Sequence, residues 1–336
     1  MTTLLTRKQL CNHVHLITMV EFENSKLNKK QILIVTSSYD KTCDYLVEKF
    51  THFKFFRLNL DKFSEYRITC SPNGFKINGA SSELDSESCL SIYFRKPSME
   101  ALDGIFESHY HSYIHKETYS LIEGIVESFK GTVLTRPSIM RRANNKVLQA
   151  SLASEAGFRL PEFAITNDVS LLKHFSEKKG IIKPVAIGEI TRNSSKEFVQ
   201  TNLINPSLST RNFEYSPVYL QNYIEKDFEV RLTIVGEQVF PVKIFSQNTI
   251  DWRKPNNRIV YETFVVPDDI ERNCFAFMKL CGMKFGCFDF IVRDDVWYFL
   301  EMNANGQWAW LEFETGLNIS ESIIDYLTAD STKMEP

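Results

Sequence analysis

Three side chains between Phe285 and Gly306 have the types and spacing of a magnesium site. Asp289 lies on one predicted short strand, and Glu301 and Asn303 lie two residues apart on the next. Successive side chains of a strand alternate between its faces, so Glu301 and Asn303 point the same way. Two carboxylates and an amide oxygen are hard ligands suited to Mg²⁺, which keeps several waters and is usually shared with phosphates. The alternative is a surface hairpin whose polar residues face water.

The connection between these two strands decides whether the acids can meet. A two-residue turn at Asp294-Asp295 would pair residue 289 with residue 300, and Asp289 and Glu301 would lie on opposite faces. A three-residue loop that also includes Val296, or a β-bulge, would pair Asp289 with Glu301 directly. The metal interpretation therefore predicts the longer loop or the bulge.

Candidate phosphate and nucleotide contacts lie earlier in the chain. Lys146 and Lys183 each stand beside an apolar segment, and a lysine is a mobile point charge suited to polyphosphate. A solvated surface lysine is the alternative for each. The apolar strand Val218 to Ile224 would offer backbone donors and acceptors at its exposed end, which could bind an adenine; otherwise it is a core strand.

Glu229 and Arg231 alternate on one predicted strand and therefore share a face. The acid could hold a ribose, and the guanidinium could hold a γ-phosphate or a developing acyl phosphate. The alternative is a cross-strand salt bridge, worth less than about 1 kcal/mol at a surface. Arg253, in the polar loop after the next strand, is a second candidate for phosphate.

Several other chemistries lack their motifs. There is no G-x-x-x-x-G-K-[ST] loop, no H-R-D and no G-x-S-x-G, and the seven histidines show no metal-ligand spacing. These absences argue against P-loop proteins, protein kinases, hydrolase triads and zinc sites.

Composition indicates a large, reduced, globular protein. The 336 residues include 43% hydrophobic side chains and 26 Phe, enough to build more than one core. The net charge of −3, with both signs interspersed, predicts neither a nucleic-acid partner nor an anionic membrane surface. Seven scattered cysteines without C-x-x-C pairs indicate free thiols and a cytoplasmic location. The apolar run Val14 to Val20 is too short for a membrane span and precedes no cleavage site.

The elements that must position these side chains predict an α/β protein with α+β subdomains. Residues 1–30 precede the first strand, 31–137 read as a βα-rich domain with a long helix from about Ser98 to Phe129, and a boundary follows. Residues 138–224 form a central unit that opens with a helix from Ile139 to about Ala156, for which Ser138 is the expected cap. Residues 225–336 contain two predicted hairpins, the second of which is formed by the acidic strands.

The order of the parts resembles the ATP-grasp superfamily: lysine, lysine, strand-edge hinge, E-V-R, then D…E-x-N. Within that superfamily, the run from Leu300 to Ser320 closely resembles the C-terminus of microviridin-type peptide macrocyclases, also called graspetide synthetases; it reads LEMNANGQWAWLEFETGLNIS. The resemblance implies an ATP-grasp fold, with an N-terminal βα pre-ATP-grasp domain, a central domain and a C-terminal antiparallel-sheet domain. It also implies that ATP and Mg²⁺, two ions in all, are the cofactors.

The same resemblance assigns a role to each candidate residue. It implies that phosphates are bound by Lys146 and Lys183, and that the transferred phosphoryl group is stabilised by Arg231 and Arg253. It implies an adenine hinge formed by Gln221, Asn222, Tyr223 and Ile224, with the ribose bound by Glu229. The metal ligands would be Asp289, Glu301 and Asn303.

The chain departs from the wider pattern in two places. Many relatives have a proline after the E-x-N asparagine, where this chain has Ala304, a change that removes no ligand. Gly188 stands alone where general ligases have a glycine-rich phosphate loop. In the macrocyclases this region, about 185–214 here, is a hairpin associated with binding the leader of the precursor peptide.

The expected activity is ATP-dependent macrocyclisation of a ribosomal precursor peptide made of leader and core. Asp or Glu side chains would be phosphorylated and then attacked by Ser, Thr or Lys side chains to give esters or amides, with release of ADP and phosphate. Relatives suggest a homodimer. Two alternatives stay open: an intermolecular carboxylate–amine ligase on a small molecule or peptide end, and a catalytically silent scaffold that binds nucleotide or peptide.

Overall fold

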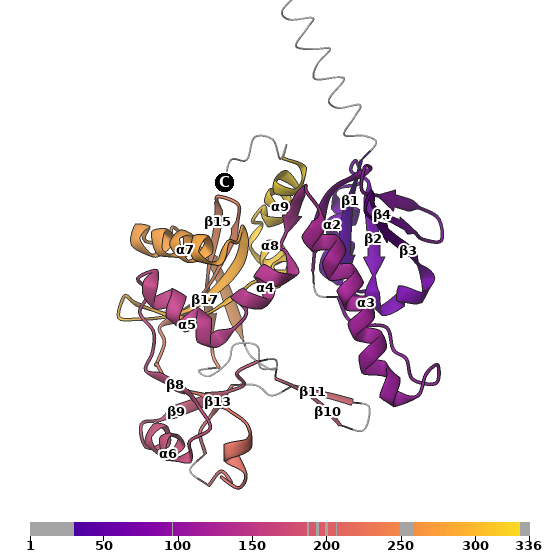
Figure 1. Cartoon of the computed structure of the whole chain (residues 1–336). Coiled ribbons are helices and arrows are strands. Elements are labelled where there is room, and N and C mark those ends of the chain that lie inside the picture. Colours follow the sequence, from indigo (N-terminus) through magenta and orange to yellow (C-terminus); the bar gives the residue numbers. More distant parts are fainter. Residues whose placement is uncertain are drawn as a thin grey trace, which may run out of the picture. The chain divides into compact units, whose positions relative to one another are not determined.

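The computed structural model describes residues 30–95, 97–186, 188–192, 195–198, 201–205, 207–248 and 258–329. The predicted N-terminal extension therefore lies outside the described residues, apart from Lys30. The chain divides into two compact units, Met1–Pro137 with Ile324–Pro336, and Ser138–Ile323. Its mixed architecture of parallel and antiparallel sheets with helices confirms the predicted α/β class (Figure 1). Among the described residues, no helix has both the length and the apolar character needed to cross a bilayer.

The first unit is built on a parallel sheet of order β2-β1-β6-β7. Its elements are β1 (Gln31–Thr36), α2 (Lys41–Lys49), β2 (Phe55–Asn59), η1 (Leu60–Glu65), β3 (Arg67–Ser71), β4 (Gly74–Asn78), β5 (Glu83–Asp85), β6 (Cys89–Phe94), α3 (Ser108–Ser128) and β7 (Thr132–Leu134). The strand β1 is buried from Ile32 onward, as a continuous apolar run in a parallel sheet requires. Asp40 caps α2 through its carboxylate. The long helix begins at Ser108, ten residues later than predicted from Ser98.

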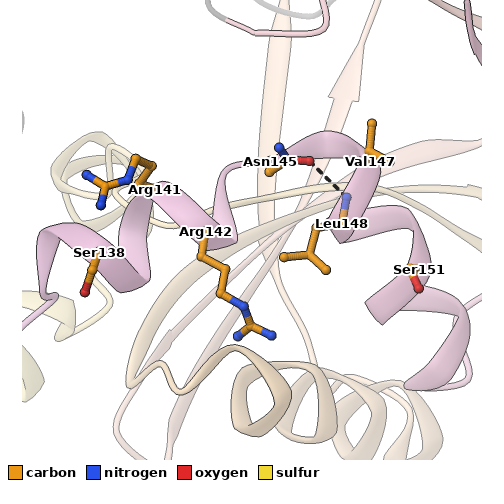
Figure 2. A pocket seen from close by; sticks show the side chains of 7 residues that line it. All are labelled: Ser138, Arg141, Arg142, Asn145, Val147, Leu148 and Ser151. Atoms are coloured by element: carbon orange, nitrogen blue, oxygen red, sulfur yellow. Dashed lines mark hydrogen bonds between the residues drawn. The ribbon is translucent and has the colours of Figure 1, made fainter.

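The second unit opens with two helices where one was predicted. They are α4 (Pro137–Ala143) and α5 (Lys146–Glu155). The predicted cap, Ser138, lies inside α4, and the chain breaks at Asn144 and Asn145 instead. The Asn145 side chain accepts a hydrogen bond from the Leu148 N–H at 3.0 Å and so caps α5 (Figure 2). The break makes Lys146 the first residue of α5 rather than a residue in mid-helix.

A small antiparallel sheet of order β12-β9-β13-β8 follows, with α6 packed across it (Figure 1). The elements of this region are β8 (Phe163–Thr166), α6 (Val169–Glu177), β9 (Gly180–Lys183), β10 (Glu189–Arg192), β11 (Ser195–Phe198), β12 (Asn202–Leu203), η2 (Phe213–Tyr215) and β13 (Val218–Asn222). Leu172 and Phe175 of α6 bury against Leu220 of the central strand. The strands β10 and β11 form a separate antiparallel hairpin.

A five-stranded antiparallel sheet of order β16-β15-β14-β17-β18 completes the second unit. The elements of this region are β14 (Phe228–Val235), β15 (Gln238–Ser246), β16 (Ile259–Thr263), α7 (Asp268–Cys281), β17 (Phe285–Arg293), β18 (Val296–Asn303), α8 (Ala309–Thr315) and α9 (Ile319–Thr328). The residues of α9 from Ile324 onward belong to the first unit. Phe158, after α5, stacks on Phe299 of β18 at 5.1 Å between ring centroids, and Phe277 of α7 meets Phe288 at 5.6 Å. This aromatic core holds α5 and α7 against the sheet.

Candidate functional site

The acidic hairpin of β17 and β18 has the register that the metal interpretation required. Its turn has two residues, Asp294 and Asp295, with positive φ angles of 50° and 59°. A bulge then shifts the register between residues 289 and 290, so that Asp289 pairs with Glu301. The extra residue on β18 is Leu300. The predicted bulge is therefore confirmed, and both acids lie on the face that also carries Asn303.

The three predicted metal ligands form one hydrogen-bonded cluster. Asn303 Nδ2 donates to Asp289 Oδ2 at 3.1 Å and to Glu301 Oε1 at 3.3 Å. Arg231 Nη1 donates to both oxygens of Asp289, at 2.6 and 2.7 Å. The arginine balances part of the negative charge that two adjacent carboxylates create.

The Arg231–Asp289 pair is a buried interaction, unlike the surface salt bridge that the sequence left open. The two side chains are 6% and 13% exposed. Burial lowers the pKa of Arg231, but Asp289, Cys287 and Glu301 together raise the pKa by more, so the guanidinium stays charged. Within the described part of the chain, the buried Arg231 Nε has no hydrogen-bond partner.

Lys146 reaches the acidic cluster from the first turn of α5. Its Nζ lies 3.9 Å from Glu301 Oε2 and donates to the Pro184 carbonyl oxygen at 2.9 Å. The side chain is only 18% exposed. The helix break at Asn145 thus brings this lysine to the carboxylate of a strand far away in sequence.

Lys183 lies at the end of β9, close enough to Glu301 and Asp289 for their charges to affect its pKa. Its Nζ donates to Gln221 Oε1 at 2.9 Å and lies 4.2 Å from the centroid of the Tyr219 ring. The pKa of Lys183 is lowered to about 8, mainly by burial and also by the charge of Lys146, while the carboxylates of Glu301 and Asp289 oppose the shift. The structure thus brings Lys146 to Glu301 and Lys183 to Gln221 and Tyr219, and neither is a solvated surface lysine.

The predicted hinge begins at the end of β13, where Gln221 is buried and bound to Lys183. The N–H groups of Asn222 and Tyr223 donate to the carbonyl oxygens of Glu162 and Lys179, at 2.9 and 3.1 Å. A nucleobase would therefore have to use other groups of the hinge, which continues to Ile224.

Asn222 also contacts Glu162 through its side chain, because Nδ2 donates to Glu162 Oε2 at 2.7 Å. Hydrogen bonds from Lys178, His174 and Asn222 lower the pKa of Glu162. The buried Asn222 Oδ1 has no hydrogen-bond partner among the residues that the structure describes. It is an acceptor that a ligand amine could use.

Glu229 lies two residues before Arg231 on β14 and is 8% exposed. Its Oε2 lies 3.0 Å from Lys226 Nζ, and the two side chains are 11% and 6% exposed. A ribose bound by Glu229 would therefore meet a carboxylate that already has a lysine partner. Arg253, the second predicted phosphate contact, lies outside the described residues.

Two contributors to the site, Gln149 and Gly306, were not predicted from the sequence. The buried amide of Gln149, on α5, hydrogen-bonds the backbone of Met302 between Glu301 and Asn303. Gly306 packs against Cys287 and Arg231, where an added Cβ would come within 2.5 Å of Cys287 Sγ. For Gln149, its spacing of three residues from Lys146 on one helix is the only available hint.

The donor chemistry fits Mg²⁺. The described residues contain no group of three or more His, Cys, Asp and Glu side chains that could hold a metal. Mg²⁺ is commonly bound by one or two carboxylates together with waters and substrate phosphates. Asp289, Glu301 and the amide of Asn303 supply that set within hydrogen-bonding distance of one another. The Asn303 amide would turn its oxygen, rather than its Nδ2, to a cation.

Comparisons with known proteins cover nearly the whole chain. The model of the RimK-like ATP-grasp domain matches residues 143–327. A search of curated protein sequences finds no match.

Solved structures resemble this one over both units. The macrocyclase MdnC from Microcystis aeruginosa MRC, bound with precursor peptide MdnA, has a TM-score of 0.79 and 25% identity, covering 89% of this chain and 100% of that chain. The macrocyclase MdnB from the same organism has a TM-score of 0.76 and 26% identity, covering 90% and 100%. The ATP-grasp ligase PsnB, complexed with a phosphomimetic variant of minimal precursor, Mg and ADP, has a TM-score of 0.72 and 18% identity, covering 90% of this chain and 98% of that chain. At this identity the comparison shows a shared fold only.

Proposed function

The chain belongs to the RimK-like ATP-grasp family and is an ATP-dependent ligase of that fold, and on this premise we propose that it closes macrocycles in a ribosomal precursor peptide. Enzymes of this fold use ATP and Mg²⁺. The resemblance to peptide macrocyclases is supported by neighbours that match 89–90% of the chain. The observation that carries the proposal is the cluster in which Lys146 and Arg231 meet the acids of the β17–β18 hairpin, with the buried Lys183 close enough for those acids to affect its pKa.

The first step is phosphoryl transfer from ATP to a side-chain carboxylate of the peptide. The bond between the γ-phosphorus and the β–γ bridging oxygen breaks, a bond from the γ-phosphorus to the carboxylate oxygen forms, and ADP leaves. The transferred group carries its charge on equatorial oxygens, so catalysis consists mainly of positioning and charge stabilisation. Lys146 and Lys183 would hold phosphate oxygens, because the Lys146 ammonium already lies at the Glu301 carboxylate and the charge of that carboxylate also acts on Lys183.

The second step closes the ring. A Ser or Thr hydroxyl, or a Lys amine, of the same peptide attacks the acyl carbon, the bond from that carbon to the phosphate oxygen breaks, and the proton of the nucleophile is lost. Phosphate leaves, and the peptide loses one water for each ester or amide. Arg231 would stabilise the phosphoryl group, since burial and Asp289 fix its guanidinium in place, and Arg253 is proposed for the same role.

The remaining residues would hold the nucleotide and its metal. We assign the adenine to the hinge of Gln221, Asn222, Tyr223 and Ile224, the ribose to Glu229, and two Mg²⁺ ions to Asp289, Glu301 and Asn303. When bound, Mg²⁺ neutralises the charge that develops on the phosphates. The buried acceptor Asn222 Oδ1 supports the hinge assignment, because a ligand amine would satisfy it.

The partner would be a precursor peptide whose leader binds the β10–β11 hairpin. MdnC was solved with its precursor peptide MdnA, which supports a peptide substrate for this chain. The hairpin is a separate two-stranded sheet in the region where general ligases have a glycine-rich loop. A peptide that is anchored there would present its core repeatedly to one active site, because tethering raises the effective concentration.

A reconstitution experiment tests the proposal. The purified protein is incubated with ATP, Mg²⁺ and a candidate precursor, chosen as a short open reading frame next to this one with Thr, Ser or Lys and Asp or Glu repeated in its C-terminal half. Mass spectrometry should show the loss of one water for each ring, together with ADP formation. ADP formation without that mass loss would overturn the macrocyclase proposal, and a gain of one amino-acid mass would identify an intermolecular ligase instead.

A further inference from the structure

Gln149 makes three hydrogen bonds deep in the second unit, although it is neither charged nor a candidate ligand. It is 5% exposed. Its Nε2 donates to the carbonyl oxygens of Ala143, at 2.7 Å, and of Met302, at 2.8 Å. Its Oε1 accepts from the Met302 N–H at 2.9 Å. One side-chain amide thus binds both backbone polar groups of one residue, as a neighbouring strand would.

The bonds to Met302 lie at the free edge of the sheet. The strand β18 is the last in the order β16-β15-β14-β17-β18, so no further strand among the residues that the structure describes pairs with its outer backbone groups. On this outer side, the Phe299 N–H donates to the Arg159 carbonyl oxygen at 2.9 Å. Further along the strand, the Met302 N–H donates to the Gln149 side chain. Because buried backbone groups need partners, Gln149 fixes where this stretch of β18 lies relative to α5.

Met302 separates the two candidate metal ligands on β18, and α5 carries the candidate phosphate lysine. Lys146 and Gln149 are three residues apart on α5 and reach the same strand, one at Glu301 Oε2 and the other at the Met302 backbone. Beside them, the Asn144 side chain accepts from the Ala304 N–H at 3.3 Å. The start of α5 and the residues just before it therefore contact Glu301, Met302 and Ala304, on both sides of Asn303.

We propose that Gln149 is a positioning residue, whose amide holds the Met302 backbone so that Glu301 and Asn303 face the same metal and Lys146 stays at Glu301. The role rests on the proposed function, because it concerns the same nucleotide and metal site. A purely structural role would be to satisfy a buried strand edge, with no consequence for the ligands. The two roles differ in what happens to Mg²⁺ binding when the amide is removed while the protein stays folded.

The test compares Gln149→Met with Leu152→Ala. Methionine has a similar length, but its side chain does not donate a hydrogen bond to the Met302 carbonyl oxygen and does not replace the amide oxygen as the acceptor for the Met302 N–H. Leu152 lies one turn later on α5, 7% exposed in the hydrophobic core, so its truncation destabilises the helix packing while it leaves the Gln149 amide in place. Two properties are measured: hydrogen exchange of the Met302 amide in the ligand-free protein, and the Mg²⁺ concentration that gives half of the thermal stabilisation by ADP.

In Gln149→Met, the Met302 amide should exchange about tenfold faster or more, and the Mg²⁺ requirement should rise about tenfold, because the Met302 backbone loses its buried hydrogen-bond partner. In Leu152→Ala, the melting temperature should fall. The ratio of the exchange rates of the Met302 and Phe288 amides should stay within about twofold of the parental ratio, and so should the Mg²⁺ requirement. If Gln149→Met does not fold, Gln149→Glu replaces it. That variant keeps the acceptor for the Met302 N–H but replaces the amide donors, and the Mg²⁺ requirement is then measured at a pH at which the new carboxyl is protonated, so that it adds no charge beside the metal site.

Three results would overturn the proposal: a protected Met302 amide in Gln149→Met, an unchanged Mg²⁺ requirement, or equal effects of Gln149→Met and Leu152→Ala. The failure of the proposed function would look different. A parent protein that Mg²⁺ and ADP do not stabilise would refute the metal assignment and with it the positioning role, whereas the exchange measurement would still decide whether Gln149 holds Met302.

Discussion

Asp289 and Glu301 are direct cross-strand partners, although their hairpin closes with a two-residue turn that would otherwise separate them. The extra residue Leu300 shifts the register by one, and this shift moves Glu301 to the face of Asp289. A bulge at this point aims a side chain rather than merely disturbing a strand. The candidate metal site depends on it.

Glu301→Gln should reduce ATP turnover by at least about a hundredfold. The amide keeps the size of the side chain, but it removes a carboxylate that lies 3.9 Å from Lys146 Nζ and 3.3 Å from Asn303 Nδ2. Steady-state ADP release and a thermal melt of the same sample measure activity and folding separately. The matched control is Glu237→Gln, the same change in the exposed β14–β15 turn, which should keep parental turnover. Turnover that survives in Glu301→Gln would argue against the metal assignment.

ATP affinity should fall as pH rises through about 8. Lys183 has a pKa of about 8, so its ammonium is present below that pH and is lost above it. Phosphate binding needs the charged form, and affinity should decrease by up to about tenfold for each pH unit above the pKa. Calorimetry in two buffers of different ionisation enthalpy should also detect proton uptake on ATP binding at this pH.

The control for this pH dependence is Lys183→Arg, whose guanidinium stays charged throughout the range. Its ATP affinity should not depend on pH near 8, and an unchanged pH profile would exclude Lys183 as the titrating group. For stability the sign is opposite. The pKa falls on folding from 10.5 to about 8, so the unfolded chain binds the proton more tightly, and this group destabilises the fold below pH 8 and ceases to do so as the pH rises towards 10.5.

Asp295→Gly should stabilise the protein by about 0.5–1 kcal/mol without changing activity. Asp295 has a φ of 59°, in the left-handed region that costs most L-residues roughly 1–2 kcal/mol and glycine almost nothing. Urea denaturation measures the difference. Asp295→Ala should shift the midpoint the other way, because alanine tolerates that region less well than aspartate does. Equal stability of the two variants would contradict the two-residue turn.

Gly306→Ala should lower both stability and turnover. The added Cβ would lie 2.5 Å from Cys287 Sγ and 3.2 Å from Arg231 Nη2, so both groups must move. Overpacking of this kind costs about 1–3 kcal/mol, and displacement of Arg231 should reduce turnover about tenfold or more. Gly124→Ala is the control: it lies in α3 with no atom within 4 Å of the new Cβ, and it should stabilise the helix by about 0.5–1 kcal/mol. Parental activity in Gly306→Ala would show that Arg231 needs no fixed position.

Local patterns in the sequence determined which elements form and which residue types could do chemistry. The alternation of Glu229 and Arg231, and of Glu301 and Asn303, places each pair on one face of a strand wherever that strand lies. The same patterns predicted the α/β class and the need for a bulge or longer loop beside Asp289. Arg253, whose role also came from the sequence, keeps the status of a prediction.

Only the tertiary structure decided which of these residues meet. The break at Asn145 was missed because both halves of the segment have good helical sequence, and the asparagine cap competes with a continuous helix through a single hydrogen bond. That break brings Lys146 to Glu301 and Gln149 to Met302, contacts between residues more than a hundred positions apart. The sequence shows on which face of a strand or helix a side chain lies, because side chains repeat every two residues in a strand and every 3.6 residues in a helix. These repeats relate residues that are close in the chain, whereas the distance from Lys146 to Glu301 is set by the packing of α5 on the edge of a sheet.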